Sequence, residues 1–93
     1  MRPITFFDLE STSVDRTSAK IVEIAIIKVN LNGSREQFES LVNPGMPIPP
    51  ESTAIHGITD EKVKDAPTLT QLLPKIIPFI EGCDIGGFNS NNY

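Results

Sequence analysis

Residues 21–29 constrain the fold of this chain more than any other segment. They read Ile-Val-Glu-Ile-Ala-Ile-Ile-Lys-Val, a nearly continuous β-branched apolar run. Such a run is typical of a strand that is buried on both faces of a sheet. A turn signal follows at residues 30–34, and residues 35–42 are then predicted to return as the second strand of a hairpin. The sequence therefore predicts a sheet built around residues 21–29.

Further elements are predicted on both sides of this hairpin. A short apolar and aromatic run at residues 4–9 predicts a strand that completes a three-stranded antiparallel meander. Residues 43–50 contain four prolines and predict an extended loop, and Thr59 or Asp60 can cap a short helix. Residues 84–88 predict a fourth strand. Because a strand reached through a helix is normally parallel to its partner, the predicted fold is α/β with a mixed sheet.

The helix before the fourth strand is predicted to begin near Thr68 and to end near Gly82. Residues 68–71 fit a capping box. The apolar residues that follow form one stripe, which is expected to face the sheet: Leu69, Leu72, Leu73, Ile76, Ile77 and Ile80. Pro74 and Pro78 lie outside the stripe and are expected to kink the helix without abolishing it.

Asp8 and Glu10 carry the clearest chemical signal in the chain. On a strand they project from the same face, about 6.5–7 Å apart along the backbone. Two unit charges at that distance repel by about 2 kcal/mol at an effective dielectric near 20, and protonation or a cation would relieve this repulsion. Carboxylate oxygens are the ligands that Mg²⁺ and Mn²⁺ prefer. The alternative is that both carboxylates lie in water at a strand end, since an isolated Asp-x-Glu is common.

Several segments, in order along the chain, resemble the DnaQ-like (DEDDh) family of 3′→5′ exonucleases. Residues 8–13, Asp-Leu-Glu-Ser-Thr-Ser, resemble the first exonuclease motif, Asp-x-Glu-Thr-Thr-Gly, with serine in place of its glycine. Residues 20–25 are similar to the family's second strand. The segments at 43–44 and 55–59 resemble its Asn-Pro…Ile-His-Gly-Ile-Thr stretch. Residues 87–93 look like the approach to the second motif, so the resemblance spans essentially the whole chain.

The resemblance implies a ribonuclease H-like fold and hydrolysis of terminal phosphodiesters of DNA or RNA by a two-metal mechanism. The implied cofactors are two divalent ions, Mg²⁺ or Mn²⁺. The implied partner is the 3′ end of a single-stranded nucleic acid. The chain is also similar to the proofreading subunit epsilon of DNA polymerase III, so a polymerase subunit is a further expected partner.

The same resemblance assigns roles to individual residues. Asp8 and Glu10 would be catalytic residues and metal ligands. Ser11, Thr12 and the backbone near Leu9 would seat the terminal nucleotide. Ile55 and His56 would line its base or sugar, and Asn89 would orient the turn at the second motif.

The chain departs from the family after Tyr93, its last residue. The second-motif aspartate and the third motif, with its general-base histidine and final aspartate, have no counterpart. His56 is the only histidine and belongs to the substrate-pocket segment. We therefore expect residues 1–93 to be the N-terminal part of a single exonuclease domain, without its C-terminal helices and last strand, and inactive alone. An apolar sheet face left uncovered would then drive self-association.

Two alternatives to a nuclease remain open at this point. A haloacid-dehalogenase-type phosphatase has a similar first motif, although a glutamate fits its second acid poorly and a hairpin follows where that fold has a helix. A non-catalytic half-domain that binds a protein or a nucleic-acid end is the other. The acidic balance, eight Lys and Arg against twelve Asp and Glu, argues against binding duplexes through a basic patch. Bound metal ions can supply the missing positive charge.

Further expectations concern location and packing. A single cysteine excludes an internal disulfide, and neither a signal peptide nor an apolar run of about 18–20 residues is present. We therefore expect a cytoplasmic protein that has no membrane partner. Glu23 could be a fifth acid near the site, but it is expected in a salt bridge or at a strand edge instead. The phenylalanines are expected mainly in the core: Phe6, Phe7, Phe79 and Phe88.

Overall fold

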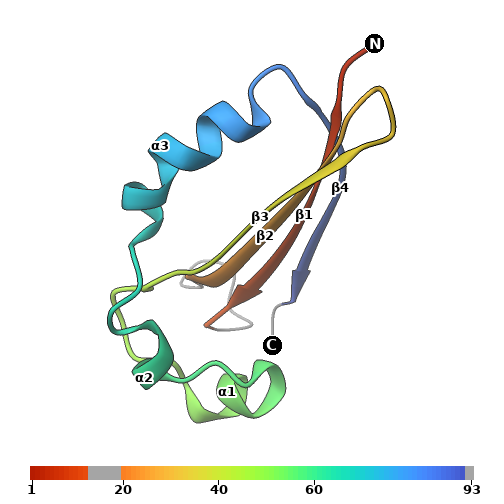
Figure 1. Ribbon diagram of the computed structural model, residues 1–93. Helices are drawn as coiled ribbons and strands as arrows, with labels where there is room; N and C mark the ends of the chain where they lie inside the picture. The colour runs from red at the N-terminus through yellow and green to blue at the C-terminus, as the bar shows by residue number, and fades with distance from the viewer. Residues whose placement is uncertain (13–19, 92–93) are drawn as a thin grey trace.

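A single four-stranded sheet forms the centre of the computed structural model, which describes residues 1–12 and 20–91, with residues 88–91 as backbone only. The strand order is β3-β2-β1-β4 (Figure 1). The strands are β1 (Ile4–Ser11), β2 (Ile21–Val29), β3 (Arg35–Leu41) and β4 (Asp84–Asn91). The first three pair antiparallel, and β4 pairs parallel with β1. The predicted mixed sheet is therefore confirmed. The fourth strand runs to Asn91, beyond the predicted residues 84–88.

Among residues 1–12 and 20–91, three helices accompany the sheet: α1 (Pro50–His56), α2 (Asp60–Val63) and α3 (Leu69–Ile80). The capping box that starts α3 is present, with the Thr68 hydroxyl accepting from Gln71 N–H at 3.2 Å and Gln71 Oε1 accepting from Thr68 N–H at 2.9 Å. Thr59 caps α2 as predicted. The sequence did not predict α1, which begins with a proline at its first position, where the missing N–H costs no hydrogen bond.

Figure 1 shows α3 lying over one face of the sheet, with α1 and α2 near the end at which β1 and β4 finish. The main core lies between α3 and the sheet and consists of Leu9, Ile24, Ile26, Val42, Leu72 and Ile76. A second cluster anchors the α1–α2 segment and consists of Val22, Ile48, Ile58 and Val63. Leu73 and Ile77 were expected to face the sheet but are 40% and 52% exposed. The part of α3 that packs on the sheet is therefore narrower than the apolar stripe in its sequence. No helix among the described residues is long and apolar enough to cross a membrane.

Within the described part of the chain, strand β2 is covered on one face only. Val22, Ile24 and Ile26 are buried on the α3 side, whereas Ile27 on the other side is 37% exposed. The expectation of burial on both faces is therefore wrong for the described residues, because α3 covers only one face. We call the opposite side the open face. Its side chains include Phe6, Asp8 and Glu10 of β1 and Glu23, Ala25 and Ile27 of β2.

Phe6 belongs to this open face and is 42% exposed, so its expected core position is wrong. Its ring lies against the glycine pair of β4. A Cβ added at Gly86 would lie 2.7 Å from Phe6 Cε1 and 2.4 Å from Ile4 Cγ2, and one at Gly87 would lie 3.3 Å from Phe6 Cδ1. The two glycines therefore allow this aromatic ring to cover the edge strand.

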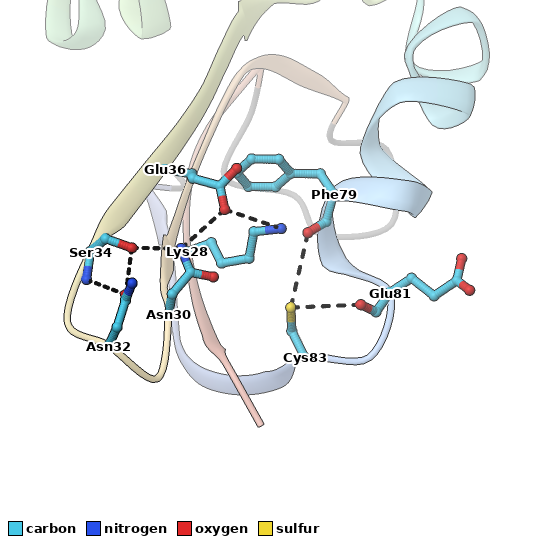
Figure 2. Close-up of polar contacts among 8 residues, drawn as sticks. All are labelled: Lys28, Asn30, Asn32, Ser34, Glu36, Phe79, Glu81 and Cys83. Atoms are coloured by element: carbon cyan, nitrogen blue, oxygen red, sulfur yellow. Dashed lines mark hydrogen bonds and ion pairs between the residues drawn. The ribbon is translucent and has the colours of Figure 1, made fainter. Parts of the chain in front are cut away.

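Lys28 joins α3 to the β2–β3 hairpin, as Figure 2 shows. Its Nζ lies 4.5 Å from the centroid of the Phe79 ring and 3.7 Å from Glu36 Oε2. Asn30 Nδ2 donates to the same carboxylate oxygen at 3.0 Å. The Lys28 side chain is only 16% exposed, so both contacts operate in a partly desolvated setting, in which they are stronger than at a bare surface.

Candidate functional site

Asp8 and Glu10 lie on the open face of β1, separated by Leu9, which is buried on the opposite face. Asp8 is exposed and pairs across the strands with Ala25. Glu10 is half-buried, its Oε2 atom is buried, and it pairs with Glu23. The predicted same-face arrangement of the two carboxylates is therefore confirmed.

Two further carboxylates share this face. Glu23 lies opposite Glu10, and Glu39 of β3 lies opposite Ala25. Burial raises the pKa of Glu23, and the negative charges of Glu39, Glu10 and Asp8 raise it further, while His56 lowers it. The open face therefore carries a negative field that a cation would offset.

The sequence interpretation underestimated Glu23 and missed Glu39. Glu23 was expected in a salt bridge or at a strand edge, but β2 is an inner strand, and none of the ion pairs of the described residues includes it. The turn at residues 30–34 could have indicated Glu39. It fixes the register of the hairpin, and this register determines which β3 residue lies opposite each β2 residue.

A hollow of about 350 Å³ lies on the open face beside Asp8. It is lined by Phe6, Phe7, Asp8, Glu23, Ala25, Ile27, Gln37 and Glu39. Within the described part of the chain, no group of three or more His, Cys, Asp or Glu could enclose a metal ion. Mg²⁺ commonly binds through one or two carboxylates and keeps several waters, so the pair Asp8 and Glu10 suits a partly hydrated ion.

The other predicted site residues in and directly after β1 are buried. Leu9, Ser11 and Thr12 are 7%, 4% and 0% exposed. The Thr12 hydroxyl accepts from Lys20 N–H at 3.0 Å and contacts Met46 Sδ at 3.9 Å. Thr12 N–H donates to the Lys20 carbonyl at 2.8 Å. These side chains fix the strand end, and their contact with a nucleotide stays a prediction.

The Ile-His-Gly-Ile segment meets the end of β1, and its contact with a nucleotide stays a prediction. His56 Nε2 lies 3.2 Å from the Ser11 carbonyl oxygen, and His56 Nδ1 accepts from Ile58 N–H at 3.0 Å. The neighbouring Ile55 is 54% exposed. Asn89 pairs with Asp8 along the parallel β1–β4 ladder, although its side chain lies outside the described part of the structure.

Comparisons with known proteins agree with this geometry. Residues 5–90 match the RNase T exonuclease family. The DNA polymerase III subunit epsilon-like protein of Rhodobacter capsulatus is 41% identical over 88 residues, which cover 90% of this chain and 12% of that protein. The PolC-type DNA polymerase III of Caldanaerobacter subterraneus is 35% identical over 85 residues, which cover 91% of this chain and 6% of the polymerase. The chain thus spans a small part of the curated relatives it matches.

A solved structure supports the fold assignment. The nuclease domain of 3′hExo, a DEDDh family member bound to rAMP, superimposes with a TM-score of 0.74 and 20% sequence identity. The match covers 98% of this chain and 52% of that domain. The four-stranded sheet is thus the ribonuclease H-like sheet of DEDDh exonucleases. This match and the antiparallel hairpin that follows β1 argue against the phosphatase alternative.

Proposed function

We propose that this chain, which belongs to the DEDDh exonucleases of the RNase T type, contributes Asp8 and Glu10 to the metal site of a 3′→5′ exonuclease. The observation that carries the proposal is the position of these two carboxylates, together on the open face of β1 and beside the parallel strand β4. Family membership supports the proposal, because the Asp-x-Glu pair resembles the first motif of this family.

The electrostatics of the open face favour divalent cations. Asp8 and Glu10 would hold the ions, and Glu23 and Glu39 would add negative charge from the neighbouring strands. When bound, two such ions would supply a water of lowered pKa and positive charge for the departing oxygen of a phosphodiester. The protein's own part is to keep the two carboxylates on one face and at a fixed spacing.

The proposed substrate is the 3′ end of a single-stranded nucleic acid. Ile55 would contact the terminal base or sugar with its exposed side chain. The buried residues Leu9, Ser11 and Thr12 would hold the end of β1, where the terminal nucleotide would be seated. The structural neighbour was solved with rAMP, and the sequence relatives are DNA polymerase III proteins. These similarities support nucleotide recognition, and a polymerase subunit is the proposed protein partner.

The further acids and the histidine base that the family uses have no counterpart among these 93 residues. We therefore expect metal and nucleotide binding without turnover from this chain alone. A metal-dependent nuclease activity that Asp8→Ala abolishes would contradict this expectation.

The first test is Mn²⁺ binding, measured by electron paramagnetic resonance of free Mn²⁺. Wild type should bind Mn²⁺, and Asp8→Ala should weaken binding at least tenfold, because one of two charged ligands is lost (~1.4 kcal/mol per tenfold). Asp65→Asn removes an exposed carboxylate outside the sheet and is the matched control, which should bind like wild type. Equal binding by wild type and Asp8→Ala would refute the metal site.

A further inference from the structure

The carbonyl groups that follow Glu10 are held by α1. Ser52 Oγ donates to the Thr12 carbonyl oxygen at 2.7 Å, across 40 residues of sequence. His56 Nε2 lies 3.2 Å from the Ser11 carbonyl oxygen, across 45 residues. Ser52 is 1% exposed and Thr12 is 0% exposed, so the first of these hydrogen bonds is fully buried.

The tautomer of His56 follows from its second contact. Its Nδ1 faces Ile58 N–H at 3.0 Å, and a backbone N–H can only donate. Nδ1 must therefore be the acceptor, which places the ring hydrogen on Nε2. The hydrogen bond to Ser11 thus runs from His56 to the strand, in the same direction as the bond from Ser52.

These bonds act at the point where β1 leaves its regular pairing with β2. Glu10 pairs with Glu23, but Ser11 pairs with Ile21, so the register shifts between Glu10 and Ser11. A β-bulge disrupts the ladder locally and reorients neighbouring side chains. Beyond it, Ser11 pairs with Ile21 and Thr12 N–H donates to the Lys20 carbonyl at 2.8 Å, while α1 holds the carbonyls of Ser11 and Thr12. The orientation of Glu10 therefore depends on what holds Ser11 and Thr12.

We infer that Ser52 and His56 are positioning residues, which fix the strand end after the bulge and thereby orient the Glu10 carboxylate. The inference rests on the proposed function, because it assigns Glu10 to the metal site. The α1 segment is itself held in place: Thr53 Oγ1 donates to the Ile58 carbonyl at 2.7 Å, and Lys62 Nζ donates to the Gly57 carbonyl at 3.0 Å.

Thr53 provides a matched control for Ser52. Both hydroxyls belong to α1 and donate to a backbone carbonyl at 2.7 Å, but that of Thr53 bonds within the α1–α2 segment and that of Ser52 bonds to Thr12, directly after β1. Ser52→Ala and Thr53→Ala therefore each remove one hydroxyl-to-carbonyl hydrogen bond of the same length, and only the first should affect Glu10.

The test begins without metal, by NMR of the 93-residue chain. Ser52→Ala should shift the side-chain carboxyl ¹³C resonance of Glu10 and speed amide exchange at Thr12 about tenfold. Thr53→Ala should change neither, and the carboxyl resonance of Glu61, an exposed residue of α2, should stay constant in both variants. His56→Gln, which keeps an N–H donor, should preserve the Glu10 resonance better than His56→Leu. An unchanged Glu10 resonance in folded Ser52→Ala would overturn the inference.

The second part is Mn²⁺ titration of the same variants. Ser52→Ala should weaken Mn²⁺ binding about five- to tenfold, the effect of losing one buried hydrogen bond, and Thr53→Ala should stay within about twofold. Equal losses in both variants would overturn the positioning role. If wild type bound no Mn²⁺, the proposed function would fail, while the metal-free NMR would still decide whether Ser52 and His56 orient Glu10.

Discussion

Glu10 of β1 and Glu23 of β2 are direct cross-strand partners on the open face of the sheet. Like charges in this position destabilise a sheet. Burial and the carboxylates of Glu39, Glu10 and Asp8 raise the pKa of Glu23. This repulsion lowers the stability of the folded chain, and a bound cation would offset it. The arrangement therefore agrees with a cation site on the open face.

The first prediction concerns Glu23→Gln. Because its pKa is raised, the folded chain protonates Glu23 more readily than the unfolded chain does. Its contribution to stability therefore falls as pH rises from the ordinary glutamate range through the raised pKa. Glu23→Gln should increase the free energy of unfolding by about 0.5–1 kcal/mol at pH 7 and have less effect near pH 4.

Urea unfolding at both pH values measures this effect. Asp65→Asn is the charge-matched control and should change stability by less than about 0.3 kcal/mol at pH 7. A loss of stability in Glu23→Gln at pH 7 would contradict the description of the open face as electrostatically repulsive.

The second prediction concerns the contact of Lys28 with Phe79 and Glu36 (Figure 2). Lys28→Met keeps an apolar stem of similar length but removes the charge, so it should lower the free energy of unfolding by about 0.5–1.5 kcal/mol. Lys75→Met, at an exposed position of α3, should have a smaller effect. Chemical denaturation measures the free energy of unfolding of both variants. Equal losses would show that the contacts of the Lys28 charge with Phe79 and Glu36 do not contribute to stability.

The third prediction compares the two glycines of β4. A Cβ at Gly86 would come within 2.4 Å of Ile4 Cγ2, whereas a Cβ at Gly87 would come no closer than 3.3 Å to Phe6 Cδ1. Gly86→Ala should therefore destabilise the chain by about 1–3 kcal/mol, and Gly87→Ala by clearly less. Thermal unfolding measured side by side gives the order, and a reversed order would refute the packing of Phe6 over β4.

The fourth prediction concerns self-association, which we propose to occur through the open face. Its apolar members Ile4, Phe6 and Ile27 are 39%, 42% and 37% exposed. Phe6→Gln should therefore shift the chain towards monomer in sedimentation velocity at high concentration. Leu31→Gln removes an apolar side chain that is 60% exposed in the hairpin turn and should leave association unchanged. A monomeric wild type would rule out this mode of association.

Much of the fold could be predicted because local patterns and packing agree. The apolar run at residues 21–29 and its turn define the hairpin, and the capping box at Thr68 marks the start of α3 despite two internal prolines. The segment that became α1 has no such signal, because Pro49 and Pro50 are equally typical of a loop. Packing against Val22 through Ile48 and Ile58 stabilises this segment, and no local pattern reports that contact.

The two acidic residues of the candidate site could be predicted from the sequence, but the residues that surround and hold them could not. Asp8 and Glu10 follow from strand alternation and from a family motif. Which residues flank them depends on register and on distant segments. Glu39 reaches the open face through the hairpin, and Ser52 reaches the strand end across 40 residues. Such contacts are properties of the assembled fold.

The most direct test of the central claim is calorimetric titration of a nucleoside 5′-monophosphate into the chain, with and without Mn²⁺, in wild type and Asp8→Ala. We predict nucleotide binding by wild type only when Mn²⁺ is present, and its loss in Asp8→Ala under the same conditions. Nucleotide binding that is independent of both Mn²⁺ and Asp8, or no binding under any condition, would contradict the assignment of this face as a half-site for metal-dependent nucleotide recognition.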